Sequence, residues 1–183
     1  MTPSQPLQQL ASAINHFSEW SGRALSWLTL AMALLTTTVV VMRYVLEINS
    51  IALQESVTYL HATVFLMGAA FTLKRGGHVR VDLFYRRLQP RWQALVDALG
   101  GLLLLLPMCV VIFWLCLDYV AASWQVREVS TEPGGLPFVY LLKSLLLMMP
   151  ITLGLQALAD IIANTLFFLG KGGSHIEPHD GGL

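Results

Sequence analysis

Apolar residues are gathered into four long stretches, which are residues 24–42, 56–73, 98–117 and 144–170. His61 and Asp160 are the only acidic, basic or histidine side chains inside them. About 20 apolar residues cross a bilayer core of roughly 30 Å, because a helix rises 1.5 Å per residue. The pattern predicts an all-α membrane protein with four transmembrane helices. The predicted spans cover about residues 24–43, 51–73, 94–118 and 143–169.

Composition supports a membrane protein. Of the 183 residues, 55% are hydrophobic and 12% are charged, whereas about 25% are charged in a typical soluble domain. The formal net charge is zero, so there is no overall basic field to attract nucleic acid. These values exclude a disordered chain, a nucleic-acid-binding protein and an ordinary soluble domain.

The basic residues lie mainly on one side of the predicted membrane. Six of the 11 lie between the second and third spans, and the positive-inside rule places that connection in the cytoplasm. Both termini are then cytoplasmic, which gives eight basic residues inside and three outside. The inner residues are Arg23, Lys74, Arg75, Arg80, Arg86, Arg87, Arg91 and Lys171, and the outer ones are Arg43, Arg127 and Lys143.

Two segments flank the transmembrane domain, which we place at residues 23–170. Residues 1–22 are predicted to form an amphipathic helix on the cytoplasmic membrane surface; a frayed terminus is the alternative. The apolar residues at helical spacing in this segment are Leu7, Leu10, Ile14 and Phe17. Residues 171–183 are polar and rich in glycine, so we expect a flexible tail. The first span is too long for a signal peptide and is interpreted as an uncleaved anchor.

Small and polar residues share faces of two predicted spans. Ser26, Thr29, Ala33 and Thr36 form one face of the first span, and such faces allow close helix packing in lipid. In the last span Gln156, Asp160 and Asn164 follow i, i+4, i+8 spacing. Both faces are predicted to meet another helix.

Asp160 and His61 are candidates for chemistry inside the membrane. A carboxylate at membrane depth is costly and is a functional hypothesis by default. The two residues are expected at similar depth, so they could pair between helices. A proton or ion relay is the functional interpretation, and a structural polar contact is favoured because one Asp and one His make a poor pathway.

The second span and the loop after it have clear local signals. Asn49 and Ser50 offer an N-cap, which puts Glu55 in the first turns of the helix. Gly76 and Gly77 can end the helix in a left-handed cap. Residues 79–89 are predicted to form an interfacial helix, and Pro90 to begin the next helix. Arg86, Arg87 and Arg91 are candidates for binding lipid headgroups.

The connection between the third and fourth spans is predicted to project beyond the membrane on the outer side. Its turn contains Pro133, Gly134 and Gly135. Asp118, Glu128 and Glu132 make this projection acidic, and Arg127 partly offsets them.

No enzymatic or cofactor chemistry is predicted. The chain has no P-loop lysine motif and no arguable Ser/His/Asp set. Only one histidine lies deep in a span, whereas a membrane haem usually needs two. We therefore expect no catalytic residue, no metal and no cofactor.

Three segments in the second span and the loop after it resemble the small membrane subunit of tripartite ATP-independent periplasmic (TRAP) transporters, the DctQ-like family. They are Leu53-Gln54-Glu55, Phe65-Leu66-Met67-Gly68-Ala69-Ala70 and Gly77-His78-Val79-Arg80-Val81-Asp82. The turn at residues 133–137 is also similar, and the resemblance covers nearly the whole chain.

The resemblance implies a bacterial inner-membrane, multi-pass subunit of a sodium-driven importer of organic acids or related solutes. Its implied partners are a large multi-span permease subunit, which holds the transport pathway, and a periplasmic solute-binding protein. Glu55, His78, Arg80 and Asp82 would hold local structure and interfaces, and none would bind the solute. The alternative is a membrane anchor or electron-transfer (haem-type) subunit of an oxidoreductase.

Overall fold

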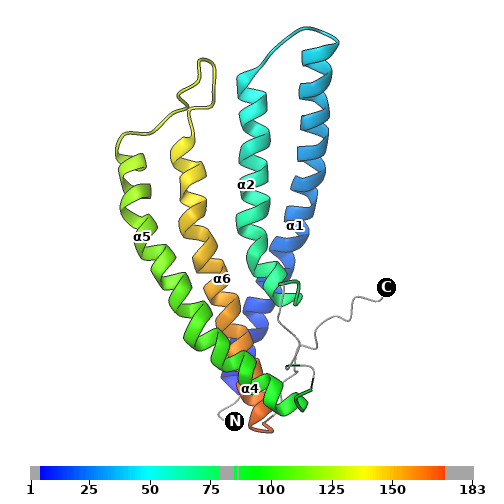
Figure 1. Ribbon diagram of the computed structural model, residues 1–183, viewed down its shortest axis with the longest axis vertical. Coiled ribbons are helices and arrows are strands. Elements are labelled where there is room, and N and C mark those ends of the chain that lie inside the picture. Colours follow the sequence, from blue (N-terminus) through cyan, green and yellow to red (C-terminus); the bar gives the residue numbers. More distant parts are fainter. Residues whose placement is uncertain (1–4, 79–84, 86, 172–183) are drawn as a thin grey trace.

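The computed structural model describes residues 5–78, 85 and 87–171 (Figure 1). Within this part the chain is helical, and no strand occurs. The helices are α1 (Gln5–Tyr44), α2 (Ile51–Lys74), α4 (Pro90–Gly100), the π-helical turn η1 (Gly101–Leu105), α5 (Leu106–Gln125) and α6 (Val139–Phe168).

Four helical segments are long and apolar enough to cross a membrane, which confirms the predicted fold class. They are Gln5–Tyr44, Ile51–Lys74, Pro90–Gln125 and Val139–Phe168. The third combines α4, η1 and α5. Its π-helical turn, closed by a hydrogen bond from the Leu106 N–H to the Gly101 carbonyl, directly precedes Pro107. Proline lacks the N–H that would continue the regular helical hydrogen bonds.

The first and last described residues lie at the same end of the bundle. Gln8 Nε2 donates to the Lys171 carbonyl at 3.5 Å, so α1 begins where α6 finishes. We call this the terminal end and the opposite one the distal end. Toward the distal end the α1–α2 pair and the α5–α6 pair diverge (Figure 1). α6 is the central helix, since it packs against α1, α2, α4 and α5.

Local signals in the sequence set several helix boundaries. The Ser50 side chain accepts from the Leu53 N–H at 3.5 Å and caps α2. Gly76, at φ +65°, ends that helix, as its left-handed backbone suits glycine. α4 begins at Pro90, as predicted.

The N-terminal segment differs from its prediction. Instead of a separate surface helix over residues 1–22, residues from Gln5 onward belong to the same continuous helix as the first span. The buried positions of α1 are Ala11, Ser18 and Gly22, and the larger residues Leu7, Leu10 and Phe17 are exposed. Small side chains let α1 approach its neighbours closely: the place of a Gly22 Cβ is already filled by the Phe71 ring of α2. The small face of this segment therefore packs against α2 and α6.

Candidate functional site

A buried polar network joins α1 to α6 near the terminal end. Gln156 is fully buried, and its Nε2 donates to Asn15 Oδ1 at 2.8 Å and to Asp160 Oδ1 at 2.9 Å. Its Oε1 accepts from the Ser18 hydroxyl at 2.6 Å. The predicted polar face of the last span thus meets another helix. Asn164, the third member of the face, is also buried, and its Oδ1 has no hydrogen-bond partner among the described residues.

Asp160 and His61 do not form the pair that the sequence suggested. Asp160 accepts from Gln156, one turn earlier on the same helix. His61 lies on an exposed part of α2, where its ring stacks on Phe65 with centroids 6.3 Å apart. The structural interpretation of Asp160 stays a prediction; its carboxylate binds Gln156, the side chain that joins α6 to Asn15 and Ser18 of α1.

An ion cluster holds α1 to the end of α2. Glu19 binds Lys74, with 2.9 Å between Oε2 and Nζ, and it also pairs with Arg75. Lys74 Nζ donates in addition to the Asn15 carbonyl at 2.8 Å. Two of the basic residues after the second span thus bind a carboxylate of α1, which sequence reasoning did not identify.

Glu55 joins the distal end of α2 to the loop between α5 and α6. One carboxylate oxygen accepts from the Ser130 hydroxyl, and the other accepts from the Leu136 N–H at 2.6 Å. Gly135 lies so close that a Cβ there would stand 2.8 Å from the Glu55 carboxylate. Glu55 therefore anchors this loop to α2.

Part of the distal acidic charge is neutralised within the chain. Glu128 pairs with Lys143, with 2.5 Å between oxygen and nitrogen. The hydrogen bond from Lys143 holds the pKa of Glu128 below its usual range. Lys143 Nζ also lies 4.1 Å from the centre of the Tyr119 ring. The predicted acidic projection is thus reduced mainly to Asp118 and Glu132.

The remaining predicted site residues lie apart from these clusters. His78 and Arg87 are exposed, and Arg80, Asp82 and Arg86 lie outside the described residues, as does most of the predicted interfacial helix at 79–89. Arg91 donates to the Phe168 carbonyl at 3.1 Å, and its guanidinium lies 4.8 Å from that ring. Arg91 therefore also contributes to the packing of α4 on α6.

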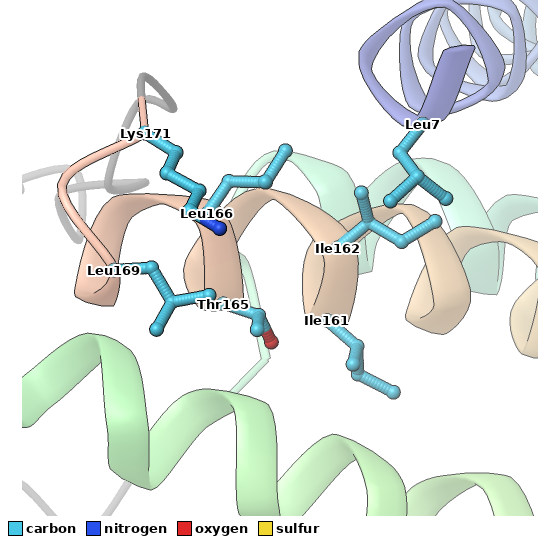
Figure 2. Close-up of a pocket in the computed structure, with 7 residues that line it drawn as sticks. All are labelled: Leu7, Ile161, Ile162, Thr165, Leu166, Leu169 and Lys171. Carbon is cyan, nitrogen blue, oxygen red and sulfur yellow. The ribbon is translucent and has the colours of Figure 1, made fainter. Parts of the chain in front are cut away.

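A groove at the terminal end runs between the start of α1 and the last turns of α6 (Figure 2). It encloses about 300 Å³ and is lined by Leu7, Ile161, Ile162, Thr165, Leu166, Leu169 and Lys171. Leu7 points toward Ile162, and the Lys171 side chain folds back toward Leu166 (Figure 2). The lining is mainly apolar, and Thr165 and Lys171 are its two polar side chains. Within the described ranges, no three His, Cys, Asp or Glu side chains are grouped as a metal site would require.

Comparison with known families identifies the chain. Residues 32–166 match the family of tripartite ATP-independent periplasmic transporters, DctQ component. The chain belongs to this family. The match extends from the last third of α1 to the last turn of α6, so it reaches all four membrane helices. No curated protein and no solved structure matches the sequence.

Membership of the DctQ family makes the chain a small subunit of a TRAP transporter and confirms the resemblance seen in the sequence. A transporter component of a membrane complex is also what the four apolar helices indicate. The alternative of a haem-type electron-transfer subunit is not favoured.

Proposed function

We propose that the chain is the non-catalytic small subunit of a sodium-gradient-driven TRAP importer of an organic acid or related solute, in the bacterial inner membrane. It holds the large permease subunit, enlarges the footprint of that subunit in the bilayer, and helps dock the periplasmic solute-binding protein. The terminal end faces the cytoplasm and the distal end faces the periplasm. The observation that carries the proposal is the family match across all four helices.

The distribution of basic residues supports this orientation. In the described part of the chain Arg23, Lys74, Arg75, Arg87, Arg91 and Lys171 belong to the terminal end. The positive-inside rule places such a surface in the cytoplasm. Arg87 is exposed there, so it is available to a lipid phosphate.

The contacts of the polar side chains favour a scaffolding role for this chain over a transport pathway within it. Gln156 binds Asn15 and Ser18 of α1 across the helix contact and Asp160 on its own helix. Glu55 is occupied by the loop before α6. A pathway for a solute or ion would need polar groups directed into a space that the solute can enter. The polar groups of these clusters instead hold helices and loops together.

The docking role is proposed for the distal surface of residues 126–138. Glu55 fixes this loop to α2, and Lys143 binds Glu128 at its start. A loop held at two points presents a defined surface to a periplasmic protein, because little conformational entropy remains to be lost on binding.

Reconstitution tests the proposal. The chain is expressed with the large permease subunit and the binding protein of the same organism, and the solute is the compound that the binding protein retains, identified by mass spectrometry. We expect the two membrane subunits to co-purify, and uptake into proteoliposomes to need all three proteins and an inward sodium gradient. Sodium-driven uptake by this chain alone, or purification of both subunits without association, would contradict the proposal.

A further inference from the structure

A groove between α1 and α2 lies on the exposed side of the bundle. It encloses about 590 Å³ and is lined by Met32, Ala33, Thr36, Val57, Thr58 and His61. These residues lie in the apolar stretches of the two helices, so the groove opens at membrane depth. A surface at this depth meets either lipid or another membrane-embedded protein.

His61 makes lipid a poor neighbour for this groove. The residue is ten positions from the start of α2 at Ile51 and 13 from its end at Lys74. At 1.5 Å per residue it lies roughly 15 Å from one end and about 20 Å from the other, which is close to the middle of a bilayer core. Its imidazole is exposed, and in the described part of the chain it makes a ring contact with Phe65 but no hydrogen bond or ion pair. Hydrocarbon cannot supply a hydrogen-bond partner, so an imidazole left there is costly.

The α1 side of the groove carries the face that the sequence predicted to meet a helix. Ser26, Thr29, Ala33 and Thr36 are exposed, because α1 packs on α2 through other positions. The Thr36 hydroxyl donates to the Met32 carbonyl in its own helix at 2.8 Å. Another helix can therefore approach the α1 face closely without forming hydrogen bonds to it, whereas His61 needs a hydrogen-bond partner.

Only a helix of another membrane protein can meet both conditions. Within lipid, a spanning segment must satisfy its own backbone, which in practice means a helix. The chain's own α5 cannot serve, since it packs against α6 on the other side of the bundle from α1 (Figure 1). The partner helix needs small residues opposite Ala33 and a polar side chain opposite His61.

We propose that the α1–α2 groove docks a membrane-spanning helix of the large permease subunit, and that a hydrogen-bonding side chain of that helix pairs with His61. This inference rests on the proposed function and adds the surface and the chemistry of the contact. α5 is then the matched reference surface, because its exposed residues lie at similar depth. Leu115 is ten positions from the end of α5 at Gln125, and it is 71% exposed.

Photocrosslinking locates the contact. The photoreactive residue p-benzoylphenylalanine replaces Thr58 in one variant and Leu115 in another, and each is co-expressed with the large subunit and irradiated in membranes. We expect an adduct with the large subunit from position 58 and none from position 115. An adduct only from position 115, or a dimer of this chain from position 58, overturns the inference while leaving the proposed function intact. Loss of co-purification in the unmodified pair would instead contradict the proposed function.

Substitutions test the chemistry of the contact. Thr58→Trp fills the groove and should lower the amount of large subunit recovered with the tagged chain by about tenfold, whereas Leu115→Trp should leave it within about twofold. His61→Leu removes the hydrogen bond and should reduce recovery, and His61→Gln should restore most of it. Equal recovery with His61→Leu and the unmodified chain would refute the role of His61. Circular dichroism of each purified variant checks that the bundle is intact.

Discussion

The contact between α1 and α6 should depend on Gln156 more than on any other polar side chain of the described chain. Gln156→Met keeps the length of the side chain and removes its polar atoms. The substitution breaks hydrogen bonds to Asn15, Ser18 and Asp160 at once. It also leaves the Ser18 hydroxyl buried without that partner, since Ser18 is 2% exposed.

The expected loss follows from the number of bonds. A hydrogen bond between membrane helices contributes about 0.6 kcal/mol on average and up to about 1.7 kcal/mol. The two bonds between α6 and α1 together therefore correspond to about 1 kcal/mol on average and up to about 3 kcal/mol, and a buried hydroxyl without a partner adds about 1 kcal/mol or more. We expect Gln156→Met to lower the free energy of unfolding by about 2–4 kcal/mol.

Unfolding of the purified chain in mixed micelles, by increasing the mole fraction of dodecyl sulfate and following helicity, measures this loss. Ser18→Ala should cost about 1 kcal/mol, and the double variant should cost less than the sum because the two residues share a bond. Thr37→Val is the control, since Thr37 is exposed and bonds only within α1, and its effect should stay within about 0.5 kcal/mol. A Gln156→Met variant as stable as the parent, or strictly additive losses, would refute the network.

Three further predictions concern other contacts. Glu55→Ala should speed hydrogen exchange at the Leu136 N–H by about tenfold or more, because a bond to a carboxylate contributes about 1.5–3 kcal/mol. Exchange in the middle of α6 should be unchanged. Unchanged exchange at the Leu136 N–H would show that other contacts hold the loop. Gly22→Ala should destabilise the chain by about 1–3 kcal/mol, since its Cβ would overlap the Phe71 ring, whereas Gly68→Ala, with open space around it, should stabilise it by about 0.5–1 kcal/mol. Because Lys143 lowers the pKa of Glu128 from 4.5, the pair adds stability above pH 4.5 that is lost as the pH falls through the lowered pKa. Glu128→Gln should flatten this part of the pH profile in the same micelle assay, and parallel profiles would count against the pair.

Signals within a few residues of one another predicted the local structure correctly. The Ser50 cap, the left-handed Gly76 and the start of α4 at Pro90 each follow from backbone constraints that one or two residues impose. The shared face of Gln156 and Asp160 follows from helical periodicity in the same way.

The partners of these side chains could not be predicted, because contacts between distant segments leave no local pattern. Glu55 binds Ser130, 75 residues later in the sequence. The N-terminal segment was interpreted from its large apolar residues, whereas its buried face consists of Ala11, Ser18 and Gly22. In membrane helices small residues often mark the contact, so this stripe was the signal that could have revealed the packing of α1.

The positions of the internal contacts have a consequence for assembly. The buried polar network and the ion cluster of Glu19 both lie toward the terminal end, where α1 crosses α6 and reaches the end of α2. Toward the distal end the two helix pairs diverge (Figure 1), and the hydrogen bonds of Glu55 join α2 to the loop before α6. The buried polar network and the Glu19 cluster thus hold the terminal half, while the distal halves of α1 and α2 present an unfilled surface between them. A partner helix in the α1–α2 groove would add contacts toward the end where the two helix pairs diverge (Figure 1), so assembly should stabilise the distal half more than the terminal half.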